Sequence, residues 1–125
     1  MFTISKAFSF SASHTLDELP EGHPCLRLHG HNYVVELVLA GEELDASGFV
    51  VDYLDLKCVG EAIDDRLDHR HLNDVLPGPT SAEAIARYVY DLAREVLPGP
   101  AASRLVAVRV SETPKTCAEF RPRAS

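Results

Sequence analysis

The sequence predicts an α+β domain in which a four-stranded antiparallel sheet carries two helices on one face. Apolar and polar residues alternate in segments near both ends of the chain, which is the period of a half-buried strand. Between them, two segments repeat apolar residues every three or four positions, as amphipathic helices do. The predicted order is therefore β-β-α-α-β-β, and strands grouped around two adjacent helices are typical of this architecture.

The first two strands are expected over residues 2–14 and 29–40. In the first, the apolar residues that include Phe8 and Phe10 share one face, and His14 ends the strand on that same face. In the second, two histidines at its start share a face with the apolar residues that follow them. Each strand therefore carries imidazole at one end of an otherwise largely apolar face.

The first helix is expected from Asp52 to about Leu67. Asp52 is a favourable N-cap, and Asp55 lies in the first turn, where a negative charge is stabilising. One apolar stripe runs along this segment and consists of Leu56, Val59, Ile63 and Leu67. A stripe of this kind predicts that the helix packs one face against the sheet.

The second helix is expected to begin at Thr80 or Ser81, because Thr80 and Glu83 have the spacing of a capping box. Its apolar stripe consists of Ile85, Val89, Leu92 and Val96. Pro98 and Gly99 then end the helix. Two more strands are expected after it, over residues 104–112, where valines alternate, and near residues 118–121.

Composition narrows the class of protein. The 125 residues predict a single domain, 1–125, and a net charge of −7 makes nucleic acid and anionic membrane improbable partners. No apolar run is long enough for a membrane span, and the N-terminus lacks the apolar stretch of a signal peptide, so a cytoplasmic location is expected. Three cysteines in such a chain do not indicate a disulfide framework.

The placement of the histidines predicts a metal site. His29 and His31 are two residues apart on one strand, so their side chains point the same way, and His14 ends a strand that can pair beside them. Three neutral imidazoles with one open position describe a catalytic zinc site. The alternative is that these are ordinary strand and loop histidines. His23 lies in a Pro- and Gly-rich loop and is not expected to be a ligand.

A thiol and an Asp–His pair are candidates for proton transfer. Cys25 lies four residues before His29, and a thiol near a cation and an imidazole has a lowered pKa. Asp68 precedes His69 and can orient its imidazole. The alternatives are a small buried thiol and a solvated helix end. Two further residues, Cys58 and Cys117, are expected to be structural only.

Glu112 ends the third predicted strand. A carboxylate at that position can accept two N–H bonds from a guanidine-like edge of a ligand. A solvated strand end is the alternative.

Taken together and in order, these segments resemble the 6-pyruvoyltetrahydropterin synthase family, and most closely the bacterial 6-carboxytetrahydropterin synthases of the queuosine pathway. The segments are Phe10-Ser11-Ala12-Ser13-His14, Cys25-Leu26-Arg27-Leu28-His29-Gly30-His31-Asn32-Tyr33, Leu67-Asp68-His69 and Glu112-Thr113-Pro114. The resemblance covers nearly the whole chain. Within it, the Cys-x-x-x-His-Gly-His element is the most specific.

The resemblance implies a role for each candidate residue. It makes His14, His29 and His31 the ligands of Zn²⁺, Cys25 the catalytic thiol, Asp68 and His69 its proton-relay partners, and Glu112 the pterin anchor. Ser81 falls near a threonine that helps to hold the pterin in the family, although the spacing there is not a clean match. Arg27, Lys115, Arg121 and Arg123 are the candidates for contacts with triphosphate.

The resemblance also implies a reaction and an assembly. The reaction is conversion of 7,8-dihydroneopterin triphosphate to 6-carboxy-5,6,7,8-tetrahydropterin with loss of acetaldehyde and triphosphate, for queuosine or another 7-deazapurine. A 6-pyruvoyltetrahydropterin synthase, another pterin side-chain lyase, or a non-catalytic zinc- or pterin-binding relative are the alternatives. The implied assembly is the tunnelling fold: trimers that close a barrel, stacked as a homohexamer with active sites between subunits. Val34 and Val38, opposite Val35 and Leu37, fit a strand that is partly apolar on both faces.

Overall fold

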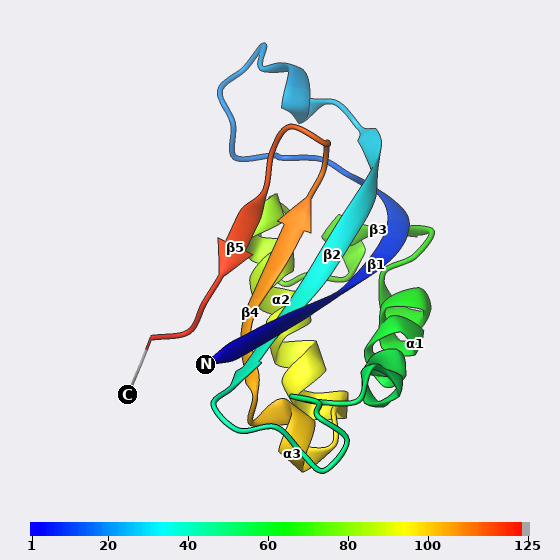
Figure 1. Ribbon diagram of the computed structural model, residues 1–125. Coiled ribbons are helices and arrows are strands. Elements are labelled where there is room, and N and C mark those ends of the chain that lie inside the picture. The colour runs from blue at the N-terminus through cyan, green and yellow to red at the C-terminus, as the bar shows by residue number, and fades with distance from the viewer. Residues whose placement is uncertain (124–125) are drawn as a thin grey trace.

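The computed structural model describes residues 1–123 and contains a five-stranded mixed sheet in the order β3-β1-β2-β4-β5 (Figure 1). Four strands are antiparallel neighbours: β1 (Phe2–His14), β2 (His29–Gly41), β4 (Leu105–Ser111) and β5 (Ala118–Phe120). The fifth, β3 (Arg70–His71), pairs in parallel with β1. The predicted four-stranded antiparallel sheet is therefore wrong, because it lacks this fifth, parallel strand at the edge. Two residues are too few to display an alternating pattern.

The hairpin of β1 and β2 is the longest feature of the sheet and sets the position of the site. The two strands pair along their whole length, from Phe2 opposite Gly41 to His14 opposite His29. Alternation along β2 buries Tyr33, Val35 and other inward residues completely, while their neighbours on the opposite face are more exposed. This alternation carries the three histidines to one end of the inward face.

The first predicted helix is present in two parts. A single 3-10 turn, η2 (Tyr53–Leu56), leads into α1 (Lys57–Arg66), and the Asp52 carboxylate accepts the Leu54 N–H at 2.9 Å as the predicted cap. All four residues of the predicted apolar stripe are fully buried: Leu56, Val59, Ile63 and Leu67. The stripe therefore packs into the core as the pattern predicted.

The second predicted helix is α2 (Ala82–Val96), and it begins at Ser81 rather than Thr80. The Ser81 hydroxyl accepts the Ala84 N–H at 3.2 Å, so the capping box predicted from Thr80 and Glu83 is wrong. Thr80 is instead fully buried, and its carbonyl and hydroxyl contact a histidine ring. After the predicted stop, residues 99–102 form one further turn, α3 (Gly99–Ala102).

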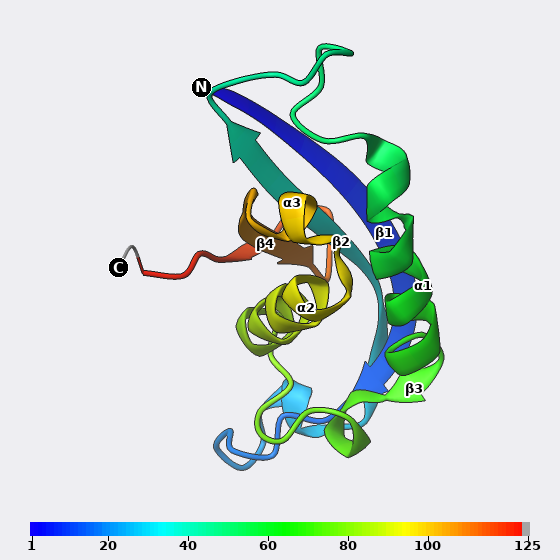
Figure 2. The ribbon, with the colours of Figure 1, turned by 90° about the horizontal axis from the view of Figure 1, so that it is seen from below.

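One hydrophobic core lies between the sheet and the two longer helices. Figure 2 shows α2 alongside β4 and α1 beside β1. On the other face of the sheet, Val34 is 44% exposed, as expected for a strand that is apolar on both faces, but Val38 is only 5% exposed within the single chain. The sheet of one chain does not close on itself, so a barrel would require other copies.

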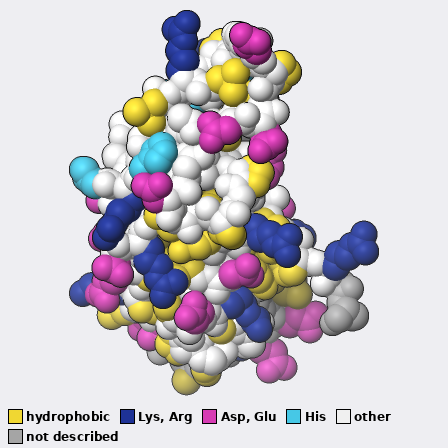
Figure 3. Space-filling view, turned by 180° about the vertical axis from the view of Figure 1, so that it is seen from behind, with side chains coloured by type: hydrophobic (Ala, Val, Ile, Leu, Met, Phe, Trp, Pro, Cys, Tyr) yellow, Lys and Arg dark blue, Asp and Glu magenta, His cyan; other side chains and the backbone are white. Residues whose placement is uncertain are grey.

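The surface carries charges of both signs. On the side opposite the view of Figure 1, basic and acidic side chains are interspersed (Figure 3). Within residues 1–123, no helix is both long and apolar enough to cross a membrane.

Candidate metal centre and active site

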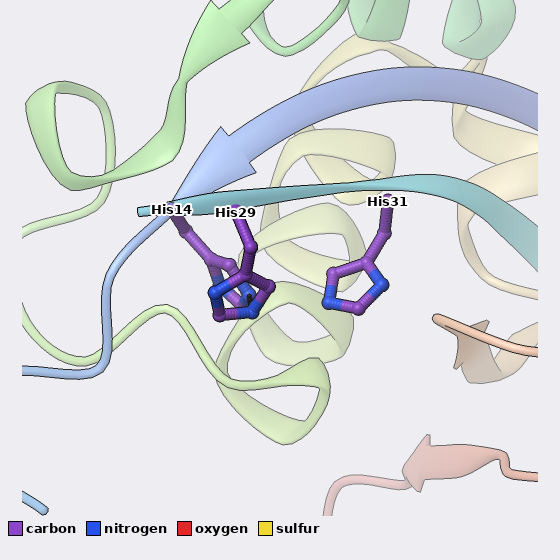
Figure 4. Close-up of side chains that lie close together, drawn as sticks. All are labelled: His14, His29 and His31. Atoms are coloured by element: carbon purple, nitrogen blue, oxygen red, sulfur yellow. Dashed lines mark hydrogen bonds between the residues drawn. The ribbon is translucent and has the colours of Figure 1, made fainter. Parts of the chain in front are cut away.

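Three imidazoles meet at the end of the β1–β2 hairpin where the connecting loop leaves β1 and enters β2 (Figure 4). His14 ends β1 opposite His29, and His31 follows two positions later on the same face of β2. One ring nitrogen from each of the three lies within 4.8 Å of the others. His14 is fully buried, whereas His29 and His31 are partly exposed, so the cluster is rooted in the core and open on one side.

Hydrogen bonds to backbone carbonyls orient two of these rings. His14 Nδ1 lies 2.8 Å from the carbonyl oxygen of Thr80, and His29 Nδ1 lies 2.6 Å from that of Arg27. A carbonyl only accepts, so each Nδ1 must carry the proton and donate. Each neutral ring then presents the lone pair of Nε2, which is the arrangement typical of metal-binding histidine.

The two Nε2 atoms of His14 and His29 are 2.9 Å apart. With both Nδ1 atoms protonated, neither neutral Nε2 has a hydrogen to donate to the other, so two lone pairs face each other. A cation between them removes this repulsion, and imidazole nitrogen is a preferred ligand of zinc. The donor set therefore fits Zn²⁺.

Burial keeps His14 in the form that binds metal. Desolvation lowers the pKa of its imidazole, and the neighbouring His29 and His31 act in the same direction, while the Thr80 carbonyl and Glu112 oppose the shift. A lowered pKa favours the neutral ring near neutral pH. Only the neutral imidazole has a lone pair for a metal ion.

A carboxylate lies beside the histidines. Glu112 follows the last residue of β4, and its Oε2 is 3.7 Å from His31 Nε2. It lines a pocket of about 580 Å³ together with Ser81, Leu16 and Cys117. The fold therefore brings Glu112 and Ser81 to one pocket next to the metal cluster, although the Ser81 hydroxyl also caps α2.

Cys25 occupies a single 3-10 turn, η1 (Pro24–Leu26), in the loop that enters β2. The residue is half-buried, its carbonyl accepts the Leu16 N–H at 3.2 Å, and its own N–H donates to the ring of His23 at 3.1 Å. Its thiol is not part of the three-histidine group. The turn nevertheless stays close in sequence to the cluster, because only Arg27 and Leu28 separate it from His29.

The Asp68–His69 pair lies between α1 and β3. The Asp68 carboxylate accepts the Ser11 N–H at 2.9 Å and contacts His69 Nδ1 at 2.8 Å. These two hydrogen bonds, that from Ser11 foremost, lower the pKa of Asp68. His69 adopts φ 57° and its side chain is 82% exposed. The carboxylate thus orients an imidazole that is open to solvent.

Within one chain, this pair lies mostly on the other face of the sheet from the metal cluster, although His31 of the cluster also lines the pocket of His69. His69 lines a pocket of about 460 Å³ whose walls include Ser11, Ser13 and Asn32. These residues alternate with Ala12, His14 and the inward histidines, so their side chains project from the opposite face of the sheet. Among residues 1–123, no hydrogen bond joins Asp68 or His69 to the three histidines.

Two residues at the site were missed by the sequence reasoning. Thr80 orients His14 through a backbone carbonyl, which leaves no trace in residue type. Tyr33 is fully buried beside His31, with 5.4 Å between ring centroids, and its hydroxyl has no hydrogen-bond partner. Burial raises the pKa of this phenol, and the Glu112 charge adds to the shift. Alternation identified Tyr33 only as a core residue.

Comparisons with known proteins agree with this geometry. Residues 3–123 match the family described as 6-pyruvoyl tetrahydropterin synthase. The chain is 38% identical to a 6-carboxy-5,6,7,8-tetrahydropterin synthase of Synechocystis, covering 100% of this chain and 98% of the relative. It is 33% identical to the protein of that name from Bacillus subtilis, covering 98% and 86%.

A solved structure extends the comparison to the fold. The 6-pyruvoyl tetrahydropterin synthase of Caenorhabditis elegans superposes with a TM-score of 0.85 at 30% sequence identity, covering 98% of this chain and 96% of the other. The similarity therefore spans the sheet, both longer helices and the loops that carry the candidate site. The chain is an enzyme of the 6-pyruvoyl tetrahydropterin synthase family.

Proposed function

We propose that the protein is a zinc-dependent lyase. With one water, it converts 7,8-dihydroneopterin triphosphate to 6-carboxy-5,6,7,8-tetrahydropterin, acetaldehyde and triphosphate, in queuosine or other 7-deazapurine biosynthesis. The observation that carries the proposal is the pair of Nε2 lone pairs facing each other on His14 and His29, with His31 and Glu112 alongside. The similarity to two proteins named for this reaction supports the same activity.

His14, His29 and His31 are the residues that would hold the zinc, through one ring nitrogen each. Bound zinc supplies Lewis-acid chemistry, which polarises oxygen atoms and acidifies the neighbouring C–H bonds. The half-open cluster leaves room for a substrate oxygen, as a catalytic site requires. No nicotinamide or flavin is needed, because the redox change of this reaction is internal to the substrate.

Glu112 would bind the pterin ring. A carboxylate has two acceptor oxygens, and the pterin edge offers two adjacent N–H donors. Each oxygen of Glu112 could therefore accept one of these N–H groups. The separation of 3.7 Å between Glu112 and His31 would hold the pterin beside the metal, so that the side chain of the substrate extends toward it. Ser81, in the same pocket, is a second candidate contact.

Cys25 and His69 would move protons. The thiolate of Cys25 acts as one acid–base group, and the His69 imidazole, oriented by Asp68, acts as the other. Because His69 shares its pocket mainly with Ser11, Ser13 and Asn32, on the face of the sheet opposite His14 and His29, we infer that the Asp68–His69 pair serves the site of a neighbouring copy. This inference agrees with the proposed homohexamer of stacked trimers, in which active sites lie between subunits.

A second candidate is 6-pyruvoyltetrahydropterin synthase activity, favoured by the similarity to the C. elegans enzyme. The two reactions differ in whether the side chain loses two carbons. The test is incubation of the zinc-loaded protein with 7,8-dihydroneopterin triphosphate, followed by mass analysis of the pterin product and detection of acetaldehyde. The carboxy product with acetaldehyde supports the first proposal. A pyruvoyl product supports the second, and intact substrate contradicts both.

A further inference from the structure

The loop between β1 and β2 contains a histidine that neither the metal cluster nor the proposed proton relay uses. His23 lies two residues before Cys25 and is exposed. It is outside the group of nitrogen atoms formed by the three candidate ligands. Its ring nevertheless makes a specific contact, because His23 Nδ1 accepts the backbone N–H of Cys25 at 3.1 Å.

We propose that His23 is a positioning residue for the Cys25 thiol, acting as the imidazole cap of the turn that carries it. This proposal deepens the proposed function and rests on it. The geometry of turn η1 explains why a cap is needed. The turn begins with Pro24, which has no N–H, so the Cys25 N–H is the first donor at its start and has no partner within the turn.

His23 contacts the turn at two points. Its side chain accepts the Cys25 N–H, and its backbone carbonyl accepts the Leu26 N–H at 3.1 Å. Ser, Thr, Asp and Asn usually cap helix starts, since their short side chains carry an acceptor oxygen. Here the unprotonated Nδ1 of imidazole takes that role. The backbone on either side of the thiol is therefore held by one residue.

The other end of the loop is tied to the metal cluster. The Arg27 carbonyl accepts the Nδ1–H of His29. The Cys25 carbonyl accepts the N–H of Leu16, so the turn is also bonded to the segment that leaves β1. The turn is thus held between a candidate zinc ligand and His23. Removing the His23 ring releases only the start of the turn, and the ligands His14, His29 and His31 keep their own contacts.

The test compares His23→Ala with His23→Asn, whose side-chain oxygen can cap in the same way. The exposed Glu21→Ala, in the same loop, is the control for a change of sequence there. Each protein is loaded with zinc and measured for zinc content, kcat and KM with 7,8-dihydroneopterin triphosphate. Alkylation of Cys25 by iodoacetamide is followed by peptide mass, with exposed Cys117 in the same sample as reference.

We expect His23→Ala to lower kcat by about 3- to 30-fold, the range that loss of an N-cap produces in a local equilibrium, with KM and zinc content unchanged. Its half-buried Cys25 becomes more accessible, so alkylation of Cys25 relative to Cys117 accelerates. His23→Asn and Glu21→Ala stay within twofold of the parent in both measurements. A merely structural role would not give a kcat effect that Asn rescues while zinc is retained.

Two results would overturn the proposal: a Cys25/Cys117 alkylation ratio unchanged in His23→Ala, or an asparagine variant as impaired as the alanine variant. Cys25→Ala, assayed in parallel, separates this failure from failure of the proposed function. If Cys25→Ala turns over substrate normally, the catalytic role of the thiol is wrong. If Cys25→Ala is inactive but His23→Ala is fully active, only the positioning role is wrong.

Discussion

At the scale of single residues, the chemistry depends on which atom of each side chain is left available. Carbonyl groups of Thr80 and Arg27 occupy the Nδ1–H of His14 and His29, so the Nε2 lone pairs remain for a cation. Asp68 in the same way occupies His69 Nδ1 and leaves the other nitrogen of that ring open to solvent. Which nitrogen of each histidine ring is left available determines what a substitution at that position should remove.

Replacement of Cys25 by alanine should leave the fold and the zinc in place and remove most turnover. The thiol is outside the metal cluster, and a positioned acid–base group contributes about 10²- to 10⁴-fold to rate. Asp68→Ala and His69→Ala should act in the same direction. Steady-state kinetics with parallel metal analysis checks this, and turnover of Cys25→Ala within a few-fold of the parent would disprove the relay.

Replacement of Glu112 by glutamine should weaken pterin binding and spare the metal. The amide can accept at only one atom, so one pterin N–H loses its acceptor or meets a donor, at a cost of about 1–3 kcal/mol. That cost corresponds to a loss of affinity between several-fold and about a hundredfold. Measured KM and pterin binding report it, and equal affinities for parent and variant would exclude Glu112 as the anchor.

At the scale of elements, long regular segments were predictable and short ones were not. The two strands of the β1–β2 hairpin repeat their alternation over 13 residues each, which identifies both the strands and the face on which the histidines lie. Strand β3 has two residues, and it pairs with β1 next to Asp68, which accepts the Ser11 N–H from a distant part of the chain. No local pattern encodes that contact.

The start of α2 shows the same limit. The sequence offered two adjacent capping residues, and local propensity favours either. The structure selects Ser81 because Thr80 is used by His14, which is 66 positions earlier in the chain. The presence of the helix was therefore predictable from its apolar stripe. Its first residue, and the contact between Thr80 and His14, depended on tertiary structure.

The cap of α2 makes a testable contribution to stability. Ser81→Ala removes the acceptor of the Ala84 N–H and should lower the free energy of unfolding by about 1 kcal/mol, while Ser81→Asn, which can cap in the same manner, should preserve most of it. Denaturant titration of the three proteins measures the difference. Equal destabilisation by alanine and asparagine would show that the hydroxyl has a different role at this position.

At the scale of the whole molecule, one chain leaves its sheet open. Strands β3 and β5 are both edges, and Val34 is exposed on the face opposite the helices. Exposed edges and apolar side chains favour association with further copies. The homohexamer itself was implied by the resemblance. The pattern of the chain, with Val34 and Val38 on the second face of β2, indicated only a strand that is partly apolar on both faces.

We expect the protein to be a homohexamer in solution, with isolated protomers inactive. Light scattering at micromolar concentration measures the assembly, and a fully active monomer would contradict it. Sites shared between copies also predict complementation. Inactive Cys25→Ala and His69→Ala chains, refolded together, should regain part of the activity, because some sites then combine an intact thiol with an intact imidazole from the neighbour. Absence of any recovery from mixed hexamers would mean that both groups act within one chain.

The central claim is that His14, His29 and His31 hold one zinc on which the chemistry depends. The most direct measurement is zinc per chain, by elemental analysis after dialysis, for the parent and for a folded His29→Ala/His31→Ala protein. Loss of two of three ligands should cripple affinity, so the account predicts about one zinc in the parent and almost none in the variant. Undiminished zinc in the double variant would contradict it.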